Sequence, residues 1–142
     1  MKSLILAVIF SSLLAAKSDA QTVPSGISQA FKSSFPHTED ANWSTTGKLY
    51  RAEFTLEGEK QFAFFSQAGE LLAESRYIDF TSLSHRLRLD LIKRFPNYNI
   101  SEMFEVNSEL DTDYYVTLER NGISFIVKSS NNSKWKIFQD IK

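Results

Sequence analysis

The sequence predicts an α+β fold of two tandem units, each a helix followed by a four-stranded antiparallel sheet, with the helices packed on one face of the sheets. Three observations predict this fold. A Phe-Pro pair at residues 35–36 recurs at 95–96. After each pair the apolar period changes from the helical 3.6 to the strand value of 2, and turn signals separate the alternating runs. We expect residues 21–80 to form the first unit and residues 81–142 the second.

Each predicted helix ends at its Phe-Pro pair and carries one apolar stripe. Ile27 and Phe31 form the stripe of the first helix, and Leu87 and Leu91 occupy the matching positions in the second. A spacing of four residues places both side chains on one helix face. The residue before a proline avoids the helical region, so each helix should stop there. Ser84 is the expected N-cap of the second helix.

The first unit should contain four strands separated by glycine turns. Tyr50, Ala52 and Phe54 alternate with polar residues, which is typical of a strand with one buried face. Gly58 should turn this strand into the next one, and a third should span Leu71–Tyr77. These strands should follow a short one with Trp43 inward, at residues 42–44.

The second unit repeats the order with a stronger hairpin signal. Asn121-Gly122 joins two alternating runs and favours a type I′ turn, in which both central residues have positive φ. The expected strands span 100–106, 114–119, 123–127 and 134–141. In the last strand either Lys134 or Trp135 could face inward, and in the first unit either Leu71 or Leu72.

Residues 1–20 are typical of a cleaved signal peptide. Lys2 is followed by an apolar run that ends at Ala16, and small residues precede Gln21 as signal peptidase requires. A membrane-spanning helix needs about 20 apolar residues. The apolar run that ends at Ala16 is shorter than this and is removed by cleavage, so we expect no membrane insertion afterwards. An exported chain without cysteine must be stabilised by its core. The 12 Phe, 5 Tyr and 2 Trp provide the apolar surface for one.

The charge composition excludes nucleic acid as a partner class. The chain carries 16 basic and 17 acidic residues, for a net charge of −1. A nucleic-acid-binding domain is usually basic and carries a clustered positive patch.

The ordered motifs of the first unit resemble a known family of exported domains. The motifs are a helix ending in Phe-Pro, then Trp43, the run Tyr50-Arg51-Ala52-Glu53-Phe54, Gly58, the Phe-rich strand 62–65, and Gly69. This pattern resembles the PepSY-like, β-lactamase-inhibitor-protein-like exported domains of Bacteroidetes. The resemblance implies an α+β fold, a periplasmic or secreted location, and a sheet face that grips a partner protein. The second unit departs from the pattern, with Met103 in place of the tryptophan.

The polar residues form no recognisable catalytic, cofactor or metal site. Neither His37 nor His85 has a second histidine or a cysteine at helical or strand spacing, and a zinc site needs three or four convergent ligands. Glu109, Asp111 and Asp113 alternate in a polar loop, but the glycine and spacing of a calcium-binding EF-hand are absent. We therefore predict no cofactor, no metal and no enzymatic activity.

The candidate binding face is the sheet face directed away from the helices. Alternation of the strands predicts that five side chains point there: Arg51, Glu53, Phe65, Tyr115 and Lys128. Aromatic residues and arginine are enriched at the centres of protein interfaces. The same residues could instead pack across strands on a covered sheet, or be buried between the two units.

The leading functional hypothesis is an exported, non-enzymatic binding protein whose partner is an unidentified protein. The second hypothesis is a propeptide-like or inhibitor-like regulator of an envelope or secreted enzyme. The third is a small hydrolase, which would require His37 or His85 to lie within hydrogen-bond reach of a serine and a carboxylate.

Overall fold

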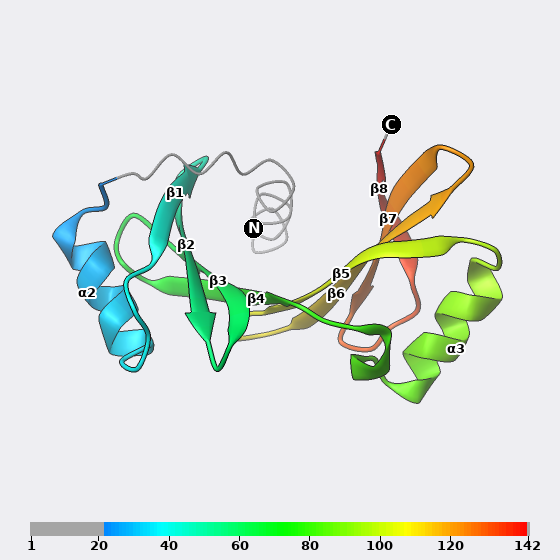
Figure 1. The fold of residues 1–142 in the computed structure, drawn as a ribbon, viewed down its shortest axis with the longest axis horizontal. Coiled ribbons are helices and arrows are strands. Elements are labelled where there is room, and N and C mark those ends of the chain that lie inside the picture. The colour runs from blue at the N-terminus through cyan, green and yellow to red at the C-terminus, as the bar shows by residue number, and fades with distance from the viewer. Residues whose placement is uncertain (1–21, 142) are drawn as a thin grey trace. The chain divides into compact units, whose positions relative to one another are not determined.

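A computed structural model describes residues 22–141 of the protein (Figure 1). The predicted signal peptide, residues 1–20, lies outside this range. The chain divides into two compact units, with the boundary between Glu74 and Ser75, and each unit is described by itself. The predicted unit limits, 21–80 and 81–142, remain a prediction.

Within residues 22–141, two short helices and eight strands follow one another. Each helix precedes a run of four strands, and a turn of 3-10 helix, η1, precedes the second helix (Figure 1). The elements are α2 (Ser25–Ser34), β1 (Asn42–Thr46), β2 (Leu49–Leu56), β3 (Glu59–Phe65), β4 (Leu71–Tyr77), η1 (Phe80–Ser82), α3 (His85–Arg94), β5 (Asn99–Asn107), β6 (Thr112–Arg120), β7 (Ile123–Ser130) and β8 (Lys136–Ile141).

Both helices stop where their Phe-Pro pairs predict. The Phe35 N–H donates to the Phe31 carbonyl at 2.8 Å, and the Phe95 N–H donates to the Leu91 carbonyl at 3.0 Å, which closes the last turn of each helix. The Ser84 hydroxyl accepts a hydrogen bond from the Leu87 N–H at 3.3 Å. The predicted N-cap is confirmed.

An aromatic cluster joins α2 to β2 and β3 in the first unit. Phe31 is its centre, because its ring lies 5.1 Å from the Phe54 ring, 5.6 Å from the Trp43 ring and 6.4 Å from the Phe65 ring. Ile27 is also buried in this cluster, as the stripe of the helix predicts. Trp43 faces inward, as expected.

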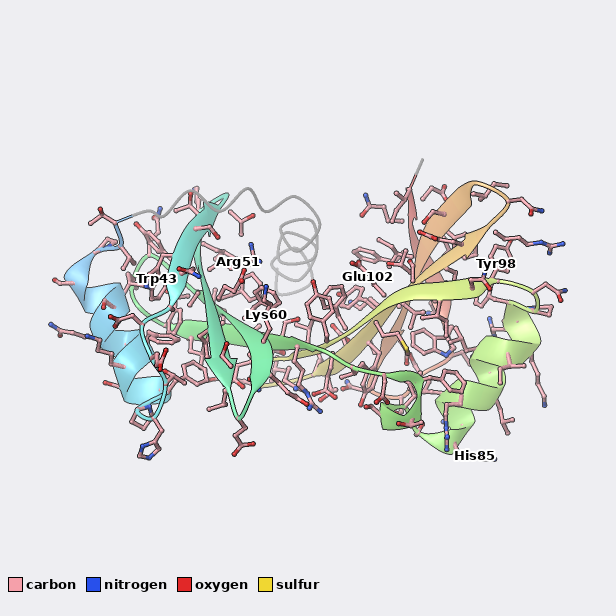
Figure 2. All side chains as sticks on the ribbon, viewed as in Figure 1. Trp43, Arg51, Lys60, His85, Tyr98 and Glu102 are labelled. Carbon is pink, nitrogen blue, oxygen red and sulfur yellow. The ribbon has the colours of Figure 1, made fainter. Side chains whose placement is uncertain are left out.

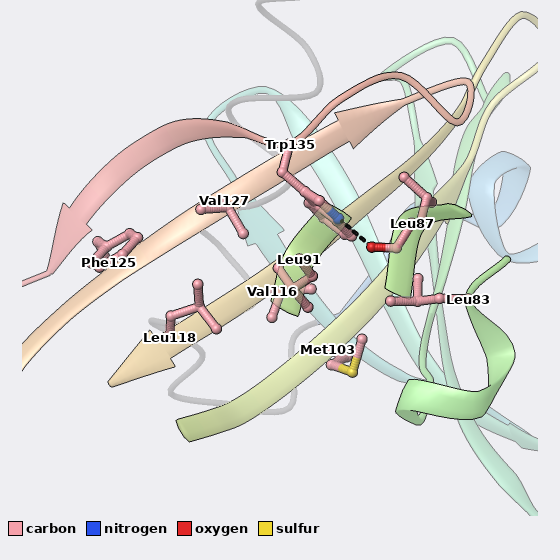
Figure 3. Close-up of a cluster of buried hydrophobic side chains, with 9 residues drawn as sticks. All are labelled: Leu83, Leu87, Leu91, Met103, Val116, Leu118, Phe125, Val127 and Trp135. Carbon is pink, nitrogen blue, oxygen red and sulfur yellow. Dashed lines mark hydrogen bonds between the residues drawn. The ribbon is translucent and has the colours of Figure 1, made fainter. Parts of the chain in front are cut away.

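The core of the second unit is mainly aliphatic and contains one buried tryptophan (Figure 3). Leu87 and Leu91 of α3 pack there against Val116 and Val127 of the strands. Trp135, directly before β8, has no exposed surface, and its Nε1 donates to the Leu87 carbonyl at 2.9 Å. Of the two residues that could face inward at this point, Trp135 is therefore the one that does.

The predicted fold class is wrong in its sheet organisation. The eight strands form one antiparallel sheet in the order β1-β2-β3-β4-β5-β6-β7-β8, not two tandem four-stranded units with helices on one face. In the described part of the chain, residues 22–141, two 10-residue helices accompany the sheet. A four-stranded sheet would leave the backbone groups of its last strand unpaired. The sheet instead continues from β4 to β5. Alternation within a strand carries no information about this pairing.

Two-residue turns fix the register of one hairpin in each unit, β2–β3 in the first and β6–β7 in the second. Asn121 and Gly122 have φ values of 50° and 77°, as the predicted type I′ turn requires. Glu57 and Gly58 are similar, with φ values of 53° and 82°. These turns pair Arg120 with Ile123 and Leu56 with Glu59.

Two glycine substitutions should change stability in opposite directions. At Gly122 the φ of 77° disfavours any L side chain, whereas Gly26 lies in α2; an added Cβ meets no atom within 4 Å at either site. We expect Gly122→Ala to lower the free energy of unfolding by about 1 kcal/mol and Gly26→Ala to raise it by about 0.5–1 kcal/mol. Urea unfolding measures both changes. An equal effect of the two substitutions would contradict the assigned turn.

Candidate functional site

The register of β2 and β3 assigns each side chain of this hairpin to one of two faces. Tyr50 pairs with Phe65 and Ala52 with Ala63, and all four side chains lie on the face that packs against α2. Neighbouring residues of a strand point to opposite faces. The opposite face, which we name the outer face, therefore carries Arg51, Glu53 and Thr55 of β2 and Lys60, Phe62 and Phe64 of β3.

The predicted outward orientation of Phe65 is wrong. Phe65 has no exposed surface and lies in the cluster under α2, with its ring 5.9 Å from the Trp43 ring. The reason is the two-residue turn at residues 57–58, which places Phe65 opposite Tyr50. The outward aromatic residues of β3 are Phe62 and Phe64, which pair with Glu53 and Arg51. The turn length was the signal that could have identified them.

Arg51, labelled in Figure 2, is a buried residue of the outer face in the first unit. Its guanidinium carbon lies 4.5 Å from the centroid of the Phe62 ring, and its Nη2 lies 3.5 Å from Glu53 Oε2. Lys60 Nζ lies 2.9 Å from the other oxygen of the same carboxylate. Arg51 is 4% exposed, whereas the Lys60 side chain is 56% exposed. Accessible charges thus border a buried arginine and aromatic ring.

In the second unit, the sheet face directed away from α3, which we also call the outer face, likewise combines aromatic rings with a cation and a carboxylate. Tyr115 pairs with Lys128 across β6 and β7, and both point away from α3, as predicted. The Tyr115 ring meets the Phe138 ring edge-on at 5.3 Å, and Lys128 Nζ lies 5.4 Å from the Tyr115 centroid. Lys128 also forms an ion pair with Asp113 at 3.2 Å. Sequence reasoning missed Phe138 and the partnership of Asp113.

Burial changes the protonation chemistry of Tyr115. The residue is 1% exposed, and burial, together with the Asp113 charge, raises the pKa of the Tyr115 hydroxyl above its usual value. The pKa of Tyr114 is raised too, first by burial and then by the Glu105 carboxylate. Tyr115 therefore stays neutral where an exposed tyrosine would ionise.

Of the five predicted residues, the structure keeps four on the outer face and buries two of those. In the first unit the half-buried Glu53 forms the rim of this face and the buried Arg51 its floor. In the second unit, described by itself, Lys128 is half-buried and Tyr115 is buried in the same way. The burial of these two residues agrees with the alternative interpretation of a covered sheet. Their role in binding remains a prediction.

The remaining polar candidates lie at the edge of this face or are already paired. His37 borders a cavity of about 480 Å³ that Glu39 and Asp40 also line, together with Glu53 and Lys60 of the outer face. Asp111 accepts a hydrogen bond from Asn131, and Asp113 pairs with Lys128. Within residues 22–141 no group of three or more potential ligands is placed to hold a metal ion.

His85 shares a second cavity with a serine and a carboxylate, which is the combination that a hydrolase would need. The carboxylate belongs to Asp90, and both of its oxygens are engaged: Oδ1 accepts from Arg94 Nε at 2.9 Å and Oδ2 from the Trp135 N–H at 3.1 Å. The serine, Ser133, accepts a hydrogen bond from the Ser130 N–H at 3.2 Å. Asp90 thus holds the backbone before β8 through Trp135 and does not orient the imidazole of His85.

Solved structures share the fold of this chain. A protein of Bacteroides eggerthii, provisionally named periplasmic, superposes with a TM-score of 0.76 at 12% identity, over 85% of this chain and 89% of that one. A DUF2874 family protein of Bacteroides ovatus gives 0.74 at 14% identity, over 82% and 89%. A BLIP-like protein of Bacteroides fragilis gives 0.70 at 16% identity, over 85% and 86%. No family model and no curated protein matches the chain.

These similarities support part of the predicted resemblance. The β-lactamase-inhibitor-protein-like fold agrees with the Bacteroides fragilis structure, whereas the PepSY-like part of the resemblance remains a prediction. The name of the Bacteroides eggerthii protein agrees with the predicted periplasmic or secreted location. Across residues 22–141 every helix is too short or too polar to cross a membrane.

Proposed function

We propose that this chain is an exported, non-enzymatic protein that binds a partner protein through the outer face of its sheet. The observation that carries the proposal is the repeated composition of that face. In each unit a buried aromatic ring lies under a cationic side chain that is paired with a carboxylate. Aromatic residues with a charged rim are typical of interface centres, where the ring supplies apolar contact and the charges orient the partner.

The rim charges are the accessible part of this arrangement. Lys60 on β3 is exposed. Lys136 on β8 is exposed too, and in the strand register it lies opposite Lys128, on the outer face. A partner that approaches either unit meets these ammonium groups before it reaches the aromatic floor. We infer that the partner presents carboxylates around an apolar segment.

Charge reversal at the rim tests this proposal. The double variant Lys60→Glu/Lys136→Glu should reduce the yield of the cross-linked partner in native envelope by about fivefold or more, because like charges slow association. Cross-linking followed by mass spectrometry measures the yield. The matched control, Lys32→Glu/Lys48→Glu, has the same charge change on α2 and on the β1–β2 turn and should leave the yield unchanged.

Two results would contradict the proposal. One is an equal loss of cross-linking in the control, and the other is no cross-linked partner for the unaltered protein. Phe65→Ala is a useful comparison, since Phe65 lies in the core of the first unit. That variant should lower stability without acting on the rim.

The second candidate function is that of an inhibitor-like regulator of an envelope or secreted enzyme. The similarity of the fold to a BLIP-like structure favours it. The two functions differ in one measurement. If the cross-linked partner is an enzyme, adding the purified protein at equimolar concentration should reduce its activity, whereas a plain binding protein should leave that activity unchanged.

A further inference from the structure

A basic pocket lies in the second unit, on the side of α3. It has a volume of about 350 Å³ and is bordered by the helix and by Ser133 and Lys134. We name residues 133–135 the strap. Arg86 and Lys93 line it from α3, and Ser133 and Lys134 line it from the strap. His85, labelled in Figure 2, lies at the start of the same helix.

Three cationic side chains line this pocket, Arg86, Lys93 and Lys134, against one carboxylate, that of Asp90. Asp90 forms an ion pair with Arg94, which lies outside the lining, and it also interacts electrostatically with Lys134. Burial alone would raise the pKa of Asp90, but hydrogen bonds from Trp135 and Arg94 hold it below its usual value, so Asp90 is charged and already paired. Within residues 22–141, Arg86, Lys93 and Lys134 form no ion pair.

The strap is fixed to the helix before any ligand arrives. The Trp135 N–H donates to Asp90, its indole Nε1 donates to the Leu87 carbonyl at 2.9 Å, and Arg94 Nη1 donates to the Trp135 carbonyl at 3.2 Å. The backbone of Lys134 is therefore held next to α3. A preformed site loses less conformational entropy when it binds a ligand.

We propose that this pocket binds a dianionic group of the phosphate class. Arginine donates two parallel hydrogen bonds to phosphate oxygens, and lysine supplies a point charge. Leu89 is 43% exposed and lines the same pocket, so it provides apolar surface for the carbon skeleton of an esterified phosphate. The whole chain has a net charge of −1, so attraction to an anion at this place is local. This site is independent of the outer face of the sheet.

Titration with inorganic phosphate tests the proposal. In amide NMR spectra of the purified protein, phosphate at constant ionic strength should cause saturable shifts confined to α3 and the strap. Arg86→Ala/Lys134→Ala should weaken the apparent affinity by about tenfold or more, because it removes two of the three cationic side chains that line the pocket. Raising the salt concentration from about 0.01 M to about 1 M should weaken binding as well.

A matched control and two phosphate sources complete the experiment. Lys32→Ala/Lys48→Ala removes two exposed cations elsewhere and should bind phosphate like the unaltered protein. Co-sedimentation with vesicles that contain phosphatidic acid, lost in the pocket variant, would identify a lipid headgroup as the source; phosphate shifts without co-sedimentation would identify a soluble phosphate. Shifts that do not saturate, or equal affinity of the pocket variant, would overturn the proposal.

Discussion

Replacing Trp135 by alanine should lower the free energy of unfolding by about 3–5 kcal/mol. The side chain has no exposed surface and packs against Leu87, Leu91 and Val127 in the core of the second unit. Its loss leaves a cavity and removes the donor of a 2.9 Å hydrogen bond to the Leu87 carbonyl. Urea unfolding followed by circular dichroism measures the change.

Two further variants separate packing from hydrogen bonding at this position. Trp135→Phe keeps an aromatic ring but removes the indole hydrogen bond to the Leu87 carbonyl, so it should cost less, about 1–3 kcal/mol. Lys134→Ala changes the exposed neighbour and should stay within about 0.5 kcal/mol of the unaltered protein. If Trp135→Ala had the same unfolding midpoint as Lys134→Ala, the tryptophan would not anchor this core.

The second large effect is expected at Phe31 in the other unit. Phe31→Ala should lower the free energy of unfolding by about 3–5 kcal/mol. The ring is 3% exposed and contacts the rings of Phe35, Trp43, Phe54 and Phe65 at centroid distances of 5.3, 5.6, 5.1 and 6.4 Å. Edge-on aromatic contacts add to the burial of apolar area, so this residue stabilises α2 against the sheet.

Lys32→Ala is the matched control, because it changes the next residue of the same helix on its exposed side. It should shift the midpoint of guanidinium unfolding very little. Phe31→Leu should give an intermediate loss, since leucine fills part of the space without the ring contacts. A ranking in which leucine is as destabilising as alanine would contradict the assigned aromatic packing.

Local signals in the sequence predicted the elements well. Each Phe-Pro pair marked a helix end, because the proline restricts the residue before it, and Asn121-Gly122 marked a type I′ turn that the φ angles confirm. The strand at Leu71–Tyr77 has the limits predicted for it. These features depend on neighbours within a few residues, so a single sequence is enough to identify them.

Contacts between residues far apart in the sequence could not be predicted. The pairing that continues the sheet beyond β4 depends on which strand edges meet, and alternation does not encode that choice. The basic pocket needs Arg86 and Lys134, which are far apart in the sequence, and Asp90 joins the two segments. The choice between Lys134 and Trp135 likewise required the position of α3.

The candidate binding face was predicted in part. Four of its five predicted residues point outward because alternation along one strand was enough to place them. Phe65 required the alternation to be carried across the turn at residues 57–58, where the pairing of Leu56 with Glu59 decides the outcome. Burial of Arg51 and Tyr115 could not be inferred from a strand pattern, because both residue types occur exposed and buried.

The turn at Glu57 and Gly58 limits which insertions this protein can tolerate. If the turn keeps its two-residue form, inserting one residue at the start of β3 would shift β3 by one position against β2. Phe62 and Phe64 would then move under α2, and Phe65 would move to the outer face. Insertion of two residues would return every side chain of β3 to its original face. Among related chains that keep the two-residue turn, insertions at the start of β3 should therefore come in steps of two.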